Sequence, residues 1–381
     1  MKKIKILFVN GSRSEWGYIE PIIDKCIKKK IEFRVFATNM TILNKHGNIV
    51  EELEKYKKFR NCFYKSYMSM EGSSHNSMAK SLGICILSIS DVIQNYNPDW
   101  VVLAGDRGEQ LAAAIAASYS YKAIAHIQAG ERSGNIDGIA RHSITKLSHL
   151  HFASNLDAYE RVKKLGEQRF RIFNFGAPQL DYIKKNLVKK KELQQKLKLE
   201  FNKDFSLVVF HPITEEYKNV NEYTNNLLNV LSKYKINHIF IFPNNDAGAE
   251  FVRSILIKKK SKNFIYFENL DRNLYLSLLK YCKFMIGNSS SGILEAASFK
   301  KPVVNIGNRQ KFRAQSKNVI NCSYGKKSIN SAIKKILSKS FKKKIINVRN
   351  IYGGINSSDR ILKTLLKMKI NKKLINKEIS Y

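Results

Sequence analysis

The sequence has few cysteines and no long apolar run, and each shortage excludes a class of protein. Its five cysteines are an odd number and include no CxxC pair, so they predict neither a disulfide framework nor a zinc site. No apolar run approaches the roughly 20 residues that span a bilayer. Residues 1–13 read as a short strand leading into a Gly turn rather than as a signal peptide. We therefore expect a cytoplasmic protein with buried, reduced thiols.

Acidic residues are also scarce beside basic ones. Lys and Arg number 67 against 31 Asp and Glu, which gives a formal net charge of +36. A nucleic-acid-binding protein would gather its cations on one face, often interleaved with aromatics, whereas these lysines are spread over several predicted helix surfaces. We favour solvated helix faces and expect neither a nucleic-acid nor a membrane partner. The excess charge would still attract an anionic substrate.

What the sequence does contain is a repeated alternation of short apolar runs with helix-like stretches. Its 381 residues, 44% of them hydrophobic, suffice for two or three domains. The alternation predicts an α/β protein with two doubly wound, Rossmann-like domains. A Lys-rich connector places the domain boundary, so we expect an N-terminal domain at residues 1–180, joined by a C-terminal helix at 358–381, and a second domain at 181–357. Strands are predicted at residues 4–9, 31–38, 100–104, 123–127, 149–153, 171–175, 207–210, 238–242, 264–267, 284–286 and 303–306.

The stretch from residue 101 to residue 146 places many charges after predicted strands. One apolar run ends at Gly105, an alanine-rich helix follows, and a second apolar run completes a βαβ unit. Asp106 and Glu109 have the spacing of a helix capping box. Ligands bind open parallel sheets at the edge where the strands end, and opposed charges there are hard to explain as packing. The charged residues at this edge are Asp106, Arg107, Glu131, Arg132, Asp137, Arg141 and His142.

Two loops of the second half also follow predicted strands. His211 and Pro212 follow the first strand of that half, and residues 287–292 (Gly-Asn-Ser-Ser-Ser-Gly) follow the fourth. The second loop opens a predicted helix at 293–299, whose free N–H groups would hold an anion. Ser290 and Ser291 are suited both to cap that helix and to bond a phosphate oxygen.

Together these motifs resemble the hydrolysing UDP-N-acetylglucosamine 2-epimerases of sialic-acid and related nonulosonic-acid pathways. The resemblance covers nearly the whole chain in one order and spacing. It implies the GT-B-like fold of that family, with two Rossmann-like domains facing across a cleft, and a homo-oligomer, either dimer or tetramer. The matching segments are residues 11–13, 105–107, 130–131, 141–146, 211–212, 243–248, 287–290 and 309–310, together with Glu295.

The same resemblance implies an activity. Family members expel the nucleoside diphosphate by elimination across C1–C2 and hydrate the resulting 2-acetamidoglucal, so that UDP-N-acetylglucosamine yields N-acetylmannosamine and UDP. The family uses no cofactor, neither NAD nor a metal. The implied catalytic residues are Asp106, Glu131, Asp137, Arg141 and His211. The implied nucleotide contacts are Arg13, Arg107, His211, Asn244, Ser289, Ser290, Glu295 and Arg309.

Several of these residues also have a purely structural interpretation. Asp106 is suited to cap the helix after it, Ser290 is suited to cap its own helix, and His211 beside Pro212 is compatible with a buried structural histidine. Glu295 either accepts from both ribose hydroxyls or faces solvent. Asp137 lies four residues before Arg141, and an ion pair between them would keep the carboxylate ionised.

The sequence departs from the family pattern at two positions that are expected near the sugar. Many relatives carry Glu or His where this chain has Gln128, which cannot act as a base at neutral pH, so proton transfer would pass to Glu131 or Asp137. A His that relatives carry after the second strand is replaced by Thr41. GDP-N-acetylglucosamine and UDP-N,N'-diacetylbacillosamine therefore stay open as substrates. A GT-B glycosyltransferase and a basic nucleic-acid-binding protein with an inactive nucleotide clamp are the alternatives from other classes.

Overall fold

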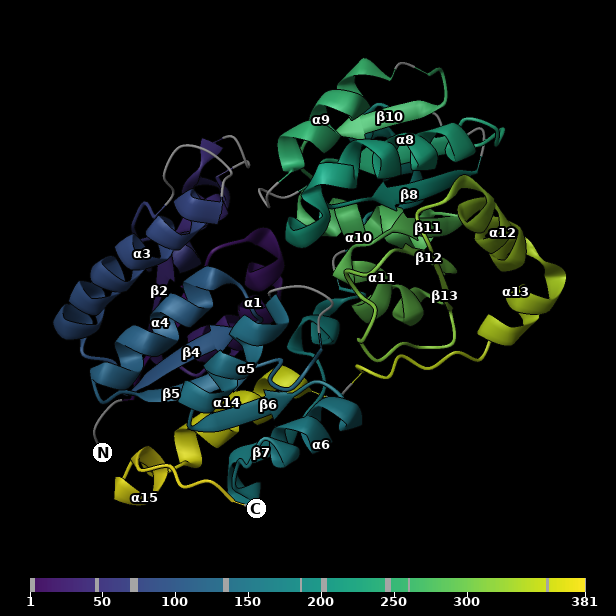
Figure 1. Ribbon diagram of the computed structural model, residues 1–381. Helices are drawn as coiled ribbons and strands as arrows, with labels where there is room; N and C mark the ends of the chain where they lie inside the picture. The colour runs from purple at the N-terminus through teal and green to yellow at the C-terminus, as the bar shows by residue number, and fades with distance from the viewer. Residues whose placement is uncertain are drawn as a thin grey trace. The chain divides into compact units, whose positions relative to one another are not determined.

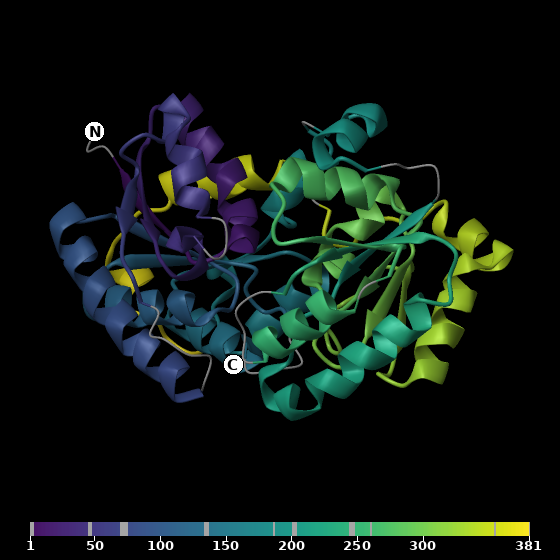
Figure 2. The same cartoon turned by 90° about the horizontal axis from the view of Figure 1, so that it is seen from above.

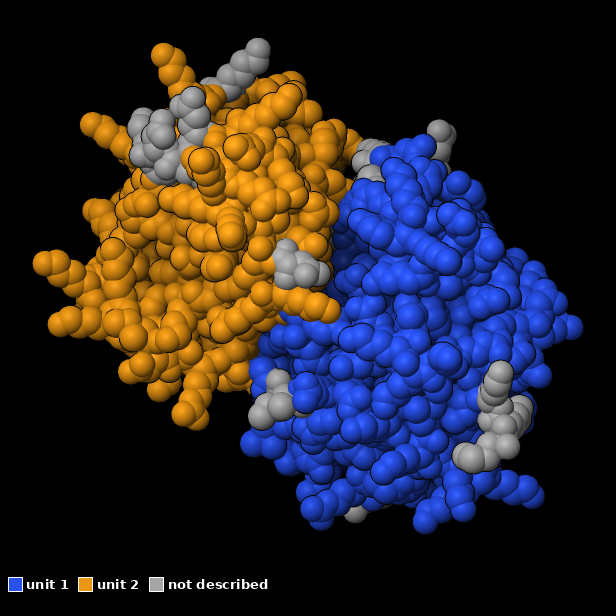
Figure 3. All heavy atoms as spheres, turned by 180° about the vertical axis from the view of Figure 1, so that it is seen from behind, with its two compact units in different colours: residues 1–131, 137–182, 352–381 blue, residues 132–136, 183–351 orange. Residues whose placement is uncertain are grey.

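The computed structural model describes residues 4–44, 48–68, 75–132, 137–185, 187–199, 204–243, 248–259, 261–353 and 356–380. The chain forms two compact units, coloured separately in Figure 3. Unit 1 contains residues 1–131, 137–182 and 352–381, and unit 2 contains residues 132–136 and 183–351. The units therefore change after residues 182 and 351, where the sequence predicts breaks after 180 and 357.

Unit 1 is built on a seven-stranded sheet in which all neighbouring strands are parallel. The strand order is β3-β2-β1-β4-β5-β6-β7, so the direction of winding reverses between β1 and β4. At such a switch point the loops that follow the two strands turn to opposite faces of the sheet, which leaves room for a ligand. The six strands predicted for this half are confirmed, and β3 is an addition. The strands are β1 (Lys5–Asn10), β2 (Glu32–Ala37), β3 (Phe63–Lys65), β4 (Trp100–Ala104), β5 (Ala123–Ile127), β6 (Leu150–Ala153) and β7 (Ile172–Asn174).

Helices cover both faces of this sheet because alternate residues of each strand point to opposite faces. On β4, Val101 and Leu103 pack with α3 and α4, whereas Trp100 and Val102 pack with α1 and α14. The Trp100 indole N–H also donates to the Leu365 carbonyl at 3.1 Å, which ties the C-terminal helix to the sheet. α1 and α14 lie side by side in Figure 2. The helices are α1 (Arg13–Lys28), α2 (Ile49–Glu54), α3 (His75–Tyr96), α4 (Gly108–Tyr119), α5 (Asp137–Leu147), α6 (Leu156–Lys164), α14 (Ser357–Lys367) and α15 (Lys372–Ile375).

Unit 2 repeats the design with six parallel strands in the order β10-β9-β8-β11-β12-β13. Its switch point lies between β8 and β11. α8, α9, α12 and α13 bury their apolar sides against one face of this sheet, and the elements are labelled in Figure 1. The five predicted strands are confirmed, and β13 is an addition. The strands are β8 (Phe205–Val209), β9 (Asn237–Ile241), β10 (Phe264–Phe267), β11 (Phe284–Gly287), β12 (Val303–Ile306) and β13 (Val319–Cys322), and the helices are α7 (Lys190–Leu197), α8 (Val220–Leu231), α9 (Ala249–Lys258), α10 (Arg272–Tyr281), α11 (Ser290–Leu294), α12 (Lys326–Leu337) and α13 (Lys339–Ile345).

The cysteines are all free, as predicted; four of the five are buried as expected, whereas Cys322 is only partly buried. Among the described residues, no helix is both long enough and apolar enough to cross a bilayer.

Candidate functional site

Arg141 is the central cation at the carboxyl edge of the unit 1 sheet. It lies on α5 and is fully buried. One terminal nitrogen of its guanidinium donates to the Asp106 carboxylate, and the other donates to the Gln128 carbonyl at 2.9 Å. A buried cation needs such a partner, because an unpaired buried charge is strongly destabilising. The structure therefore brings together Asp106 and Arg141, which the sequence assigned separately to the site.

The capping box expected at Asp106 is wrong. α4 begins at Gly108, its N-cap is Arg107, and no side chain caps it. Gly105 turns the chain with a φ of +94°, and the Asp106 carboxylate that follows it accepts from Arg141. A left-handed backbone conformation of this kind favours glycine.

His126 connects the Asp106 turn to α5. Its ring is fully buried, with Nε2 2.8 Å from the Gly105 carbonyl oxygen and Nδ1 3.1 Å from the Thr145 hydroxyl. A carbonyl oxygen only accepts, so Nε2 carries the proton. Burial lowers the pKa of His126 to about 3, and the ring is neutral at physiological pH. The sequence marked His126 only as part of a strand; its role depends on partners from two other segments.

Arg107 and Glu109 form part of a second polar group at this edge, next to β1. Glu109 is buried and accepts from Arg107 Nε and from Asn39 Nδ2, both at 3.2 Å. Burial and the neighbouring Glu109 raise the pKa of Glu15 well above its ordinary value. The carboxylate of Glu109 reaches this position because Gly11 has no side chain; a Cβ there would lie 1.9 Å from Glu109 Oε1.

Two more predicted residues of unit 1 have defined surroundings. Arg13 lies at the start of α1 and forms a paired contact with Glu52, at 2.7 and 3.2 Å. Glu131 is buried and follows Gly130, whose carbonyl accepts from Arg161 of α6 at 2.8 Å. A Cβ on Gly130 would lie 2.2 Å from the Ala158 carbonyl oxygen, so only glycine lets the chain pass α6 so closely.

Two residues of the predicted site lie wholly or partly outside the described residues, and Thr41, which departs from the family pattern, lies within them. Asp137 begins α5, but its side chain lies outside the described part of the chain, so its pairing with Arg141 stays a prediction. Asn244 lies outside the described residues altogether. Thr41 is buried and donates to the Thr38 carbonyl at 2.6 Å, a local turn bond at the end of β2.

In unit 2, Asn288 joins the two predicted loops. Its side-chain carbonyl accepts from the His211 backbone N–H at 2.7 Å, and its side-chain amide donates to the His211 carbonyl at 2.8 Å. The Asn288 backbone carbonyl in turn accepts from Arg309 at 3.3 Å and Gln310 at 3.2 Å. The structure thus gathers His211, Ser289 and Arg309 around one buried asparagine. From the sequence, Asn288 was noted only as one residue of the 287–292 motif and was given no role.

The start of α11 differs from the prediction. Ser289 is the N-cap, and its hydroxyl accepts from the Ser291 N–H at 3.3 Å, whereas Ser290 is the first helical residue. The helix covers only Ser290–Leu294 and gives way to a 3-10 turn, where a helix at 293–299 was predicted. Ser291 donates instead to Glu295 Oε2 at 2.6 Å. The expected capping roles of Ser290 and Ser291 are therefore wrong.

Glu295 does not face solvent. Its side chain is buried, and while Oε2 accepts from Ser291, Oε1 accepts from Arg272 Nη2 at 2.8 Å. Each carboxylate oxygen has a second lone pair, so the group can still accept a ligand hydroxyl. Arg272, the first residue of α10, was missed by sequence reasoning because its partner lies one strand further along the chain.

Comparisons with known proteins all give the same family. A family model described as "UDP-N-acetylglucosamine 2-epimerase" matches residues 25–366. The chain is 32% identical to the UDP-N,N'-diacetylbacillosamine 2-epimerase (hydrolyzing) of Legionella pneumophila over 99% of both chains. It is 34% identical to the GDP/UDP-N,N'-diacetylbacillosamine 2-epimerase (hydrolyzing) of Campylobacter jejuni over 96% of both, and 33% identical to the UDP-N-acetylglucosamine 2-epimerase of Neisseria meningitidis serogroup B over 88% of both.

A solved structure gives the fold. The crystal structure of UDP-GlcNAc 2-epimerase from Neisseria meningitidis bound to UDP-GlcNAc superposes with a TM-score of 0.81 at 21% identity, covering 96% of this chain and 100% of that one. The predicted class, two Rossmann-like domains of the GT-B-like type, is confirmed.

Proposed function

Because this chain belongs to the UDP-N-acetylglucosamine 2-epimerase family, we propose that it is a hydrolysing nucleotide-sugar 2-epimerase. It converts UDP-N-acetylglucosamine to N-acetylmannosamine and UDP, by elimination to 2-acetamidoglucal followed by hydration. The observation that carries the proposal is the pair of Asp106 and Arg141 at the carboxyl edge of the unit 1 sheet, where the buried Glu131 also follows β5. Acids and a buried arginine at a sheet edge supply general acid–base and electrostatic catalysis.

The elimination needs a base for the proton on C2. When that proton leaves, its bonding electrons form the C1–C2 double bond, and the C1–O bond breaks to release the diphosphate. We assign proton removal to Glu131 or Asp137, because Gln128 cannot act as a base and the Asp106 carboxylate is already engaged by Arg141. Asp106 then accepts a proton from the water that adds to C1, while C2 receives a proton from the other face. Gln128 takes no part in proton transfer.

The nucleotide is assigned to the polar groups of unit 2 and to two arginines of unit 1. Glu295 accepts from the ribose hydroxyls while Arg272 and Ser291 hold its carboxylate. The charged and hydroxyl side chains around Asn288 stabilise the negative charge of the diphosphate, which makes it a better leaving group. The assigned nucleotide contacts are Arg13, Arg107, His211, Asn244, Ser289, Ser290, Glu295 and Arg309, with His211 also assigned to catalysis.

A second substrate has its own support. The Legionella and Campylobacter relatives named above are called diacetylbacillosamine epimerases, and their identities of 32% and 34% lie on either side of the 33% of the N-acetylglucosamine relative. UDP-N,N'-diacetylbacillosamine, a 2,4-diacetamido sugar, is therefore the second candidate, with the same chemistry at C1 and C2. The product would enter sialic- or legionaminic-acid synthesis in the cytoplasm, and we expect a dimer or tetramer.

One experiment tests both the reaction and the substrate. The full chain is incubated in D2O with UDP-N-acetylglucosamine, GDP-N-acetylglucosamine or UDP-N,N'-diacetylbacillosamine, and products are followed by NMR. We expect UDP release and a free 2-epimeric sugar with deuterium at C2, without any acceptor present. Release that requires an acceptor sugar would indicate a glycosyltransferase instead. A product without deuterium at C2 would exclude the elimination route.

A further inference from the structure

The C-terminal segment of residues 372–380, here called the strap, is bonded into unit 1 along its length. Arg171, a fully buried side chain, donates to the carbonyls of Leu374 at 2.6 Å, Lys373 at 2.8 Å and Asn376 at 3.2 Å. The Ser380 N–H donates to the Gly166 carbonyl at 2.8 Å. A buried side chain and a backbone bond thus hold the strap against unit 1 at both of its ends.

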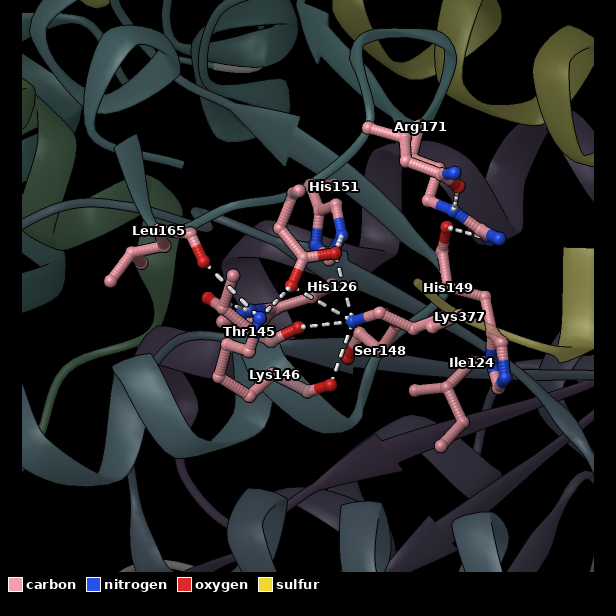
Figure 4. Close-up of polar contacts among 12 residues, drawn as sticks. Ile124, His126, Thr145, Lys146, Ser148, His149, His151, Leu165, Arg171 and Lys377 are labelled. Carbon is pink, nitrogen blue, oxygen red and sulfur yellow. Dashed lines mark hydrogen bonds and ion pairs between the residues drawn. The ribbon is translucent and has the colours of Figure 1, made fainter. Parts of the chain in front are cut away.

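The strap delivers one ammonium group to the end of α5. Lys377 Nζ donates to the carbonyl oxygens of Lys146 at 2.7 Å and Ser148 at 2.6 Å, with that of Thr145 at 3.4 Å. Figure 4 shows these contacts converging on Lys377. The last carbonyls of a helix have no intrahelical partner and carry partial negative charge, which a cation satisfies. Lys377 is therefore the C-terminal cap of α5, supplied from the far end of the chain.

A buried carboxylate holds that ammonium in place. Glu167 Oε2 lies 2.8 Å from Lys377 Nζ and 2.9 Å from His151 Nε2, and Oε1 lies 3.0 Å from Lys146 Nζ. Burial alone would raise the pKa of Glu167, but the His151 hydrogen bond and the Lys377 cation outweigh it and lower the pKa to about 2. Burial lowers the pKa of Lys377 to about 8, so the pair is charged at pH 7.

α5 carries this anchoring to the candidate catalytic residues. The helix has 11 residues, or roughly 16 Å at 1.5 Å per residue, and is too short to bend freely. Within it, Thr145 contacts His126, which bonds the Gly105 carbonyl, and Arg141 bonds Asp106 itself. Movement at the Lys377 end of α5 would therefore shift both the arginine and the turn that presents the aspartate.

We propose that Lys377 is a positioning residue for the reaction: through the strap it fixes the end of α5, so that Arg141 meets Asp106 in the reactive geometry. The inference rests on the proposed function for its kinetic consequence, but not for its structural one. A misplacement of about 1 Å in such a constellation costs up to a hundredfold in rate.

The test compares Lys377→Met with Lys372→Met, a matched control on the same strap whose side chain is exposed. At pH 7 we expect Lys377→Met to lower kcat about tenfold and to leave the UDP dissociation constant within about twofold of wild type, because no assigned nucleotide contact lies on α5. Lys377→Arg keeps the charge and several donors, so it should recover part of kcat. The control should behave as wild type.

Hydrogen exchange of α5 amides is the second measurement and needs no turnover. We expect faster exchange in α5 for Lys377→Met and unchanged exchange for the control. Exchange and kcat both equal to wild type in Lys377→Met would overturn the inference, as would equal losses in the Lys372 control. If Lys377→Met fails to bind UDP and is misfolded, Glu167→Gln takes its place, with a smaller loss of kcat expected. A wild type without turnover would refute the proposed function, while the exchange result would still decide the role of the strap.

Discussion

The carboxyl edges of the two sheets hold their polar residues by different means. In unit 1, side-chain charges pair with one another inside the protein: Arg141 with Asp106, and Arg107 with Glu109. In unit 2, the neutral amide of Asn288 joins the loops through backbone groups, and Glu295 pairs with Arg272. Fixed charges in a dry environment suit the stabilisation of charge that develops during a reaction, whereas hydrogen-bonded loops suit recognition. On this basis we propose that most of the chemistry belongs to unit 1 and most of the nucleotide contacts to unit 2.

The largest effect should come from the carboxylates of unit 1. Glu131→Gln or Asp137→Asn keeps the shape and removes the charge, so turnover should fall at least about a thousandfold while UDP binding, measured by calorimetry, is retained. Asp204→Asn, which removes the exposed partner of Lys283, is the control and should have little effect. Near-normal turnover in both catalytic variants would leave Asp106 as the remaining base.

Lowering the pH should destabilise unit 1 more than unit 2. Unit 1 buries His126, His149 and His151, with pKa values lowered by burial to about 3, 4 and 4, while unit 2 buries His238, whose pKa is lowered to about 4. Below pH 6.5 these histidines are protonated in the unfolded chain but stay neutral in the folded protein. The free energy of unfolding therefore falls from pH 6.5 towards pH 4. We expect unit 1 to lose more stability than unit 2 between pH 7 and pH 5, because it buries three such rings against one, although the raised pKa of Glu15 in unit 1 offsets part of that loss.

This prediction has a convenient probe. Both tryptophans, Trp16 and Trp100, lie in unit 1, so their fluorescence during urea unfolding reports that unit, and hydrogen exchange of β8 and β11 reports the other. His238→Gln should reduce the pH dependence in unit 2 alone. Equal losses in the two units would contradict the assignment of three neutral buried rings to unit 1.

The ribose contact of unit 2 should give a smaller, purely binding effect. Glu295→Ala should weaken UDP binding about twentyfold with little change in kcat at saturating substrate, because its contact exists in the ground and transition states alike. Arg272→Ala should act in the same direction, and both variants should discriminate less between UDP and 2'-deoxy-UDP. Arg253→Ala, which removes the exposed pair with Glu268, is the matched control. If turnover collapses while UDP affinity holds, Glu295 belongs to the chemistry and the division of labour is wrong.

The smallest effect is the stabilisation by the nucleotide itself. UDP that binds the native state raises the midpoint of thermal unfolding, by about 3 °C at a concentration some tenfold above its dissociation constant. The shift should appear in differential scanning calorimetry of the full chain. No shift with either UDP or GDP at millimolar concentration would contradict a nucleotide site.

Much of the architecture could be read from local patterns. The run Trp100 to Ala104 is apolar throughout, as a parallel strand covered on both faces requires, and it forms β4. The predicted strands are present in the structure because each is an apolar run that ends at a Gly or polar turn. β3 and β13 were not predicted: they are three and four residues long, lie at sheet edges and are only partly buried, so their apolar signal is weak.

The polar contacts of the site were decided by tertiary structure. The sequence determined which acids, arginines and serines follow the strands, because strand ends are fixed by local composition. It did not determine that Arg141 pairs with Asp106, 35 residues away, or that Lys377 caps α5 from 231 residues beyond Lys146. Local capping rules also offered Ser290 and Ser291 as caps, whereas Ser289 is the N-cap and the Ser291 hydroxyl donates to Glu295, four residues further on. A charge or donor chooses its partner only once folding removes water and brings distant segments together, and sequence spacing does not record that choice.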